Sequence, residues 1–251
     1  MQNQIINDKQ ISEFVGRLST SAGANLRAVI LYGSAASEEF HKDFSDINVL
    51  CVLHDLSAEA MRAASPAVHW WTEKNHPAPL LFTQEEVVRS ADVFPIELLD
   101  IQQQHRVLSG EDIFSALQVP MDLHRVQLEH ELRTKLLLLR QQYVACSHQG
   151  TPKQESDKKG RKKVSALMLE SISSFITLFR HTLITMGEKP PKAKREIVQR
   201  LAQRLSFEAG PFLQILEMRE GRLKAEALDV QGTFANYVKA VERVIQAVDA
   251  L

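Results

Sequence analysis

The sequence predicts an α+β protein, in which a small mixed β-sheet with helices over residues 1–120 precedes an all-α helical bundle over residues 121–251. Short β-type apolar runs alternate with helical stretches in the first part, whereas the second part places its apolar residues almost entirely at helical spacing. Charge divides the chain in the same way. Residues 1–120 carry 8 Lys and Arg against 16 Asp and Glu, and residues 121–251 carry 22 against 15. We therefore expect a domain boundary near Pro120.

The first part has the elements of a sheet core. Strands are expected at 27–32, 46–53, 79–82 and 94–101. Helices are expected at 9–21, 34–39, 57–64, 66–75, from Thr83 onward, and from Gly110 toward Pro120. Thr83 and Glu86 have the spacing of a capping box, in which each side chain satisfies a backbone N–H of the other residue.

The second part predicts an up-down bundle, because long helical stretches are joined by short loops. Helices are expected at 121–146, 163–186, 192–206, 211–220 and 233–250, with a polar, basic connector at 147–163. The apolar set expected for the first of these helices is Leu123, Val126, Leu128, Leu132, Leu136 and Leu139.

Composition excludes several protein classes. With 44% hydrophobic and 24% charged residues, the chain is neither disordered nor fibrous, and two cysteines form no disulfide framework. The N-terminus has neither a basic segment nor an apolar one, so we expect no signal peptide. A cytoplasmic protein with free thiols and no membrane partner is the expectation. The basic run at 158–163 has no interleaved aromatic residues, so we expect no nucleic-acid partner.

Three groups of residues in the first part combine into a candidate reaction site. Gly33 and Ser34 follow a predicted strand, where glycine allows a phosphate to approach the backbone and the serine hydroxyl can bind it. Asp46 and Asn48 open the next strand and, by alternation, share one face. Glu97 and Asp100 lie on the later predicted strand, three positions apart, so only one of them can join Asp46.

Oxygen ligands beside a phosphate-binding turn are what Mg²⁺-dependent phosphoryl or nucleotidyl transfer requires. The charge division has two interpretations. Two oppositely charged domains can simply attract each other, or a metal site can face basic residues that receive phosphates.

The segment LYGSAASEEFHKDFSDINVLCVL resembles the signature of the DNA polymerase β-like nucleotidyltransferase superfamily, and the resemblance covers about residues 10–115. The helical part is similar in plan to the helical domains of antibiotic-modifying members. The resemblance implies that Gly33 and Ser34 contact nucleotide phosphates and that Asp46 ligates two Mg²⁺ ions. It also implies a third carboxylate that helps bind metal and acts as the general base. Glu97 is the first candidate for it and Asp100 the second.

One position departs from the family pattern. Asn48 stands where the resemblance implies a second carboxylate, and an amide oxygen can ligate Mg²⁺ but brings no charge. We expect a weakened two-metal site unless a triphosphate supplies the missing charge.

The leading hypothesis is an enzyme that moves a nucleoside monophosphate from a nucleoside triphosphate to a hydroxyl of a small molecule or a protein. The alternative is a catalytically impaired relative that binds a nucleotide or a protein partner. An antitoxin-like role is a third option, but the large helical part argues against it.

Overall fold

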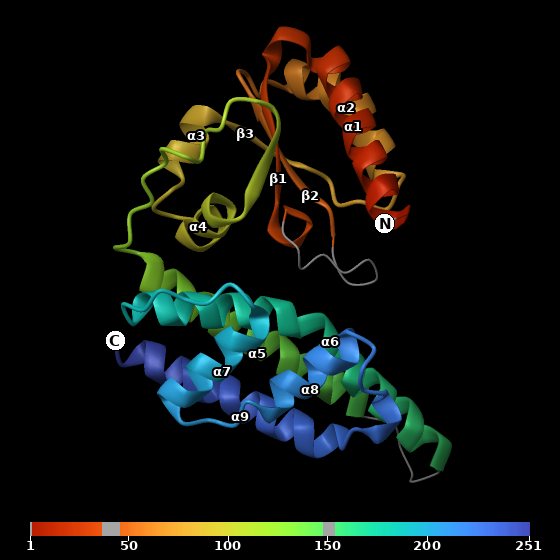
Figure 1. The fold of residues 1–251 in the computed structure, drawn as a ribbon, viewed down its shortest axis with the longest axis vertical. Coiled ribbons are helices and arrows are strands. Elements are labelled where there is room, and N and C mark those ends of the chain that lie inside the picture. Colours follow the sequence, from red (N-terminus) through yellow and green to blue (C-terminus); the bar gives the residue numbers. More distant parts are fainter. Residues whose placement is uncertain (1, 37–45, 148–153) are drawn as a thin grey trace. The chain divides into compact units, whose positions relative to one another are not determined.

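A computed structural model describes residues 2–36, 46–147 and 154–251 of the chain. The chain divides into two compact units, Met1–Met121 and Asp122–Leu251. Figure 1 shows the sheet in the first unit and the helical second unit. This is the α+β organisation that the sequence predicts.

The first unit is built on a four-stranded sheet with the order β3-β2-β1-β4. Its strands are β1 (Leu26–Tyr32), β2 (Asn48–Leu53), β3 (Leu80–Thr83) and β4 (His105–Gly110). The central strand β1 runs antiparallel to β2 and to β4, while β2 and β3 are parallel. The sheet is therefore mixed, as expected.

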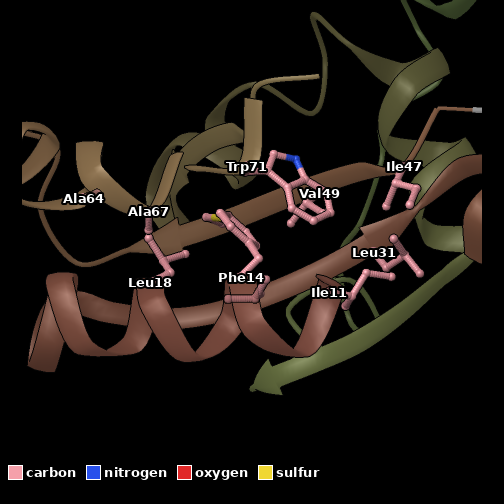
Figure 2. Packing of buried hydrophobic residues seen from close by; sticks show 11 residues of the cluster. Ile11, Phe14, Leu18, Leu31, Ile47, Val49, Ala64, Ala67 and Trp71 are labelled. Carbon is pink, nitrogen blue, oxygen red and sulfur yellow. The ribbon is translucent and has the colours of Figure 1, made fainter. Parts of the chain in front are cut away.

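One face of the sheet packs against α1 (Gln2–Ala22) and α2 (Ala58–Thr72). Figure 2 shows Phe14 of α1 near Trp71 of α2 and Leu18 of α1 near Ala67 of α2, in a cluster that also contains Leu31 and Val49 of the sheet. The rings of Phe14 and Trp71 lie 4.8 Å apart, and both side chains are fully buried. Strand alternation explains the arrangement, because every second residue of β1 and β2 points to this face.

The intervening strand residues, including Ile30, Leu50 and Val52, pack on the opposite face. They contact buried residues of α3 (Gln84–Arg89), of α4 (Pro95–Gln103) and of the segment around Phe114. The capping box expected at Thr83 is present at the start of α3. Because helices cover both faces, a functional site has to lie at the ends of the strands.

The strand predicted at 94–101 is wrong, because these residues form helix α4. Pro95 occupies the first helical turn, where its missing N–H costs nothing, and Glu97 complements the positive helix N-terminus. Leu98 and Ile101 are three positions apart and are both buried, which fits one helix face. A short apolar run does not distinguish a strand from a helix by its period, and β4, which pairs with β1, follows only at His105.

The second unit contains long helices, as the sequence predicts. They are α5 (His124–Ser147), α6 (Gln154–Thr185), α7 (Lys194–Leu205), α8 (Gly210–Arg219) and α9 (Val230–Asp249). Helix α6 contacts α5, α7, α8 and α9 and so forms the centre of the unit. Its Phe179 meets Phe212 of α8, which in turn stacks on Tyr237 of α9 at 4.3 Å.

Three further expectations are corrected. No helix begins at Gly110, since 111–120 contains only turns and extended chain. Helix α6 begins at Gln154, well inside the expected connector, of which 148–153 lies outside the described residues. Leu123 and Val126 are 48% and 53% exposed, because the buried set of α5 repeats at three and four positions from Leu128 onward and occupies the other side of the helix.

A buried histidine pair joins α5 to α6. His124 Nε2 lies 2.8 Å from His181 Nδ1, and Thr185 Oγ1 lies 3.1 Å from His124 Nδ1. The Thr185 hydroxyl donates to the carbonyl of His181, so it accepts from His124 Nδ1–H. His124 Nε2 then accepts from His181 Nδ1–H, so both ring nitrogens of His124 are hydrogen-bonded to side chains of α6.

Cys51 and Cys146 are free thiols, and Cys51 is buried. Within the described ranges, no helix combines the length and the apolar character needed to span a membrane.

Gly110→Ala is expected to destabilise the first unit by about 2–3 kcal/mol. Gly110 has a φ of 80°, and an added Cβ would collide with the carbonyl oxygen of Arg27 on the neighbouring strand. Urea unfolding followed by tryptophan fluorescence measures this unit alone, because both tryptophans, Trp70 and Trp71, lie in it. The matched control is Gly16→Ala in α1, where a Cβ meets nothing within 4 Å. It should stabilise by about 0.5–1 kcal/mol, and equal effects of the two variants would contradict the β1–β4 contact.

The helical unit should lose stability as the pH falls from 6.5 toward 4. Burial and the neighbouring His181 lower the pKa of His124 from 6.5 to about 4. In this window the unfolded chain takes up a proton that the folded chain does not, and the loss levels off below about pH 4. One proton gives a slope of at most about 1.4 kcal/mol per pH unit. Urea unfolding followed by circular dichroism should show a shallower pH dependence in His124→Gln than in the wild type.

Candidate functional site

Four connections meet at one edge of the sheet. The registers pair Tyr32, the last residue of β1, with Asn48 of β2 and with His105 of β4, the first residues of those strands. Strand β3 runs parallel to β2, so the loop that enters β3 reaches the same edge. The end of β1 therefore meets the starts of three other strands.

Gly33 turns the chain immediately after β1. Its φ of 72° lies in the left-handed region, which glycine adopts without strain. A Cβ at this position would lie 3.4 Å from Asn48 Nδ2, so the Asn48 side chain lies beside the turn. Ser34 follows in the short 3-10 helix η2 (Gly33–Ala36). The structure thus brings together Gly33, Ser34 and Asn48, while 37–45 of the motif lies outside the described residues.

Asp46 reaches the same edge from the chain that enters β2. The strand begins at Asn48 and not at Asp46, so strand alternation does not by itself orient the Asp46 side chain. The residue is exposed, and the next residue, Ile47, is buried against the α1–α2 face. The Asp46 carboxylate is close enough to His76 to act on the pKa of that imidazole.

His76 is a residue of this edge that sequence reasoning missed. Its Nε2 lies 3.0 Å from Gln10 Oε1, and its ring stacks on Trp71 at 4.0 Å. Burial lowers the pKa of His76, and the Asp46 carboxylate opposes the shift. The sequence carries no signal for this neighbourhood, because Asp46 and His76 meet only through the pairing of β2 with β3.

Tyr32 and His105 were also missed. Both belong to the cross-strand row that starts at Asn48, and burial raises the pKa of the Tyr32 phenol. His105 Nδ1 lies 2.8 Å from the carbonyl oxygen of Ile101, and its Nε2 lies 3.1 Å from Asp112 Oδ1. The carbonyl oxygen of Ile101 and the carboxylate of Asp112 are both hydrogen-bond acceptors. His105 thus links the end of α4 to β4. Sequence reasoning would have identified His105 only if it had assigned the strand to 105–110 and not to 94–101.

Asp112 completes this connection. Desolvation acts to raise the pKa of its carboxyl group. Hydrogen bonds from the amides of Phe114 and Ser115 and from His105 outweigh desolvation and lower the pKa below its usual value. The anionic Asp112 therefore holds the chain after β4 in place.

Glu97 and Asp100 lie on α4 and not on a strand. Three positions apart on a helix, they share one side, so the expectation that they point to opposite faces is wrong. Glu97 is exposed and Asp100 is half-buried. The choice between them as third carboxylate therefore stays open.

The donors at this edge fit a cation that arrives with a nucleotide better than a preformed metal centre. Among the residues with described positions, no three His, Cys, Asp or Glu side chains group closely enough to hold a metal ion. Mg²⁺ commonly binds through one or two carboxylates together with substrate phosphates. Asp46 and the amide oxygen of Asn48 match that pattern.

Comparison with known proteins supports the fold. No protein-family model matches the chain, and no curated protein matches it in sequence. Among solved structures, the chain is similar to the spectinomycin adenyltransferase AAD(9) from Enterococcus faecialis, solved with ATP and spectinomycin. The TM-score is 0.52 at 14% identity, and the match covers 93% of this chain and 98% of that one. The chain therefore shares the fold of a nucleotidyltransferase.

Substitutions at Gly33 should rank by their tolerance of positive φ. Asn adopts the left-handed region more readily than Ala, and β-branched Val tolerates it least. We expect Gly33→Ala to cost about 1–2 kcal/mol, Gly33→Asn less and Gly33→Val more, measured by urea unfolding with tryptophan fluorescence. Equal costs for Asn and Val would mean that the turn does not require a positive φ.

Proposed function

We propose that this chain is a nucleotidyltransferase that moves a nucleoside monophosphate from a nucleoside triphosphate to a hydroxyl group and releases pyrophosphate. The observation that carries the proposal is the left-handed Gly33 turn with the Asn48 side chain beside it, at the sheet edge that Asp46 also reaches. The fold shared with an adenyltransferase supports the same reaction class.

Gly33 and Ser34 bind the triphosphate in this proposal. The left-handed turn bares backbone N–H groups without a side chain in the way, and the Ser34 hydroxyl adds a polar group. Asp46 is exposed at the same edge, so its carboxylate is free to face a nucleotide-borne cation rather than the apolar core. In this proposal, these residues hold the triphosphate while the hydroxyl attacks.

Mg²⁺ bound with the triphosphate would neutralise phosphate charge, and Asp46 and Asn48 would hold it together with either Glu97 or Asp100. The hydroxyl oxygen forms a bond to the α-phosphorus while the bond from that phosphorus to pyrophosphate breaks. The hydroxyl proton passes to Glu97 or Asp100. The variants Glu97→Gln and Asp100→Asn distinguish which of the two carboxylates accepts it. Asn48 brings no charge, so the triphosphate has to supply it.

A small-molecule acceptor is favoured over a protein hydroxyl. The similar adenyltransferase was solved with spectinomycin, a small-molecule ligand, and the match extends over nearly the whole of both chains. Spectinomycin is therefore a reasonable first probe of the acceptor class.

A second candidate is a catalytically impaired protein that binds a nucleotide or a protein partner. Asn48 favours this second candidate, because, of Asp46 and Asn48, the two polar residues at the start of β2, only Asp46 carries a charge. The described residues also lack a three-donor metal group. Both candidates are expected to bind a nucleotide, but only the first is expected to transfer a nucleoside monophosphate.

The active enzyme should transfer label from one of four α-³²P-labelled nucleoside triphosphates. Each is incubated with Mg²⁺ or Mn²⁺ and with spectinomycin or a cell extract as acceptor source. Asp46→Asn should abolish transfer, whereas His69→Gln on the exposed side of α2 should leave it unchanged. Nucleotide binding measured by calorimetry, without transfer from any triphosphate, would favour the catalytically impaired protein. If the chain neither binds nor transfers a nucleotide, both candidate functions are wrong.

Asn48→Asp should tighten divalent-metal binding about tenfold, or about 1.4 kcal/mol. At an effective dielectric near 20, one added charge about 4 Å from another gains about 4 kcal/mol, and desolvation removes much of that gain. Calorimetric titration of ATP with Mg²⁺ compares the wild type, Asn48→Asp and Asp46→Asn. An unchanged affinity in Asn48→Asp would show that position 48 does not face the cation.

A further inference from the structure

We propose that His76 Nδ1 is a ligand of the divalent cation held at Asp46. The site would then combine carboxylate oxygen and imidazole nitrogen and bind Mn²⁺ or Co²⁺ more tightly than Mg²⁺. This inference rests on the proposed function for the role of Asp46 and adds a donor that the three-carboxylate pattern lacks.

The sheet brings the two side chains to one place. Strands β2 and β3 are parallel neighbours, with Leu50 opposite Leu80 and Cys51 opposite Leu81. Asp46 precedes Leu50 by four residues and His76 precedes Leu80 by four residues, so the chains that enter the two parallel strands bring both residues to the same end of the sheet. The action of the Asp46 carboxylate on His76 is an independent sign that they are near each other.

The hydrogen bond of the ring leaves the correct nitrogen for a metal. Gln10 presents its carbonyl oxygen 3.0 Å from His76 Nε2, so that nitrogen is the N–H donor. In the neutral ring, Nδ1 then carries the lone pair. A metal-binding histidine typically donates its other N–H to a carbonyl or carboxylate in this way, which fixes the ring and raises its basicity.

The ring is also held in position before any ligand arrives. It stacks on the fully buried Trp71, whose Nε1–H donates to the carbonyl of Pro77 at 2.9 Å. Asn75, just before the histidine, has a φ of 63° in the left-handed region. The loop therefore turns sharply and is tied to α2 on both sides of His76.

The surroundings favour the neutral ring, which is the form that binds metals. On α1 it meets the uncharged Gln10, on α2 the indole of Trp71, and the Asp46 carboxylate is the charged group that acts on it. Burial lowers the pKa of His76, and the Asp46 carboxylate opposes that shift.

A nitrogen donor changes which ion is preferred. Mg²⁺ takes oxygen ligands almost exclusively, whereas imidazole suits first-row transition ions, whose affinity rises from Mn²⁺ to Co²⁺. With Asn48 uncharged, an imidazole beside Asp46 compensates in bond strength for the charge that the second carboxylate would have supplied.

The test uses the full chain with Mn²⁺ alone. Electron paramagnetic resonance measures free Mn²⁺ during titration, and pulsed measurements detect ¹⁴N directly bonded to the ion. We expect ¹⁴N coupling in the wild type. We also expect that displacing half of the bound Mn²⁺ requires at least a tenfold excess of Mg²⁺ over Mn²⁺. His76→Gln should lose the coupling and bind Mn²⁺ at least tenfold more weakly, and Gln10→Ala should bind it about tenfold more weakly.

His69→Gln is the matched control, because His69 lies in the last turn of α2, close in sequence to His76, but is exposed and paired with Glu73. It should retain both affinity and ¹⁴N coupling. Mn²⁺ bound without ¹⁴N coupling in the wild type, or coupling that persists in His76→Gln, overturns the inference and leaves Asp46 as an oxygen site. An absence of Mn²⁺ binding overturns the inference alone, because a cation that arrives with a nucleotide could still use Asp46, and the transfer assay tests that role separately. The wild-type spectrum decides even where a variant fails to fold.

Discussion

The register of β1 against β2, with Tyr32 opposite Asn48, is the constraint on which the candidate site depends. It sets the Gly33 turn beside the first residue of β2, and the antiparallel β4 adds His105 on the other side. A shift of β2 by one residue would send Asn48 to the α1–α2 face and Val49 to the opposite face. The two apolar layers that bury alternate residues of β1 and β2 therefore hold the register and, with it, the site.

Coverage of both sheet faces explains why the polar residues gather at one edge. Helices α1 and α2 lie on one face and α3 and α4 on the other (Figure 1), so the faces hold apolar contacts. Polar groups are then presented by connections: Gly33 after β1, Asp46 before β2 and His76 before β3. Each of these residues is held by its neighbours. Gly33 is in a left-handed turn, Asp46 precedes the buried Ile47, and His76 stacks on Trp71. Such anchoring suits a site that has to hold a flexible, highly charged ligand.

The shared fold does not by itself decide the chemistry. At 14% identity, the similarity to an adenyltransferase extends over both chains but leaves the reaction to individual residues. In the proposed function Asn48 is decisive, because an amide in place of a carboxylate would lower the negative charge without removing a ligand oxygen. An adjacent imidazole and a triphosphate are two different ways to restore binding strength, and they favour different ions. The identity of the bound cation therefore carries information about mechanism as well as affinity.

The sequence by itself determined the α+β class, strands β1 to β3, the Thr83 capping box and the long helices of the second unit. These depend on local periods and caps that neighbouring residues carry. It did not determine α4, since a short apolar run such as 94–101 suits either a strand or a helix until its partners are known. The tertiary structure also decided that Asp46 has His76 as a neighbour and that His105 ends the row from Asn48. Strand pairing between residues far apart in the chain creates those neighbours. No local sequence pattern predicts which distant strands will pair.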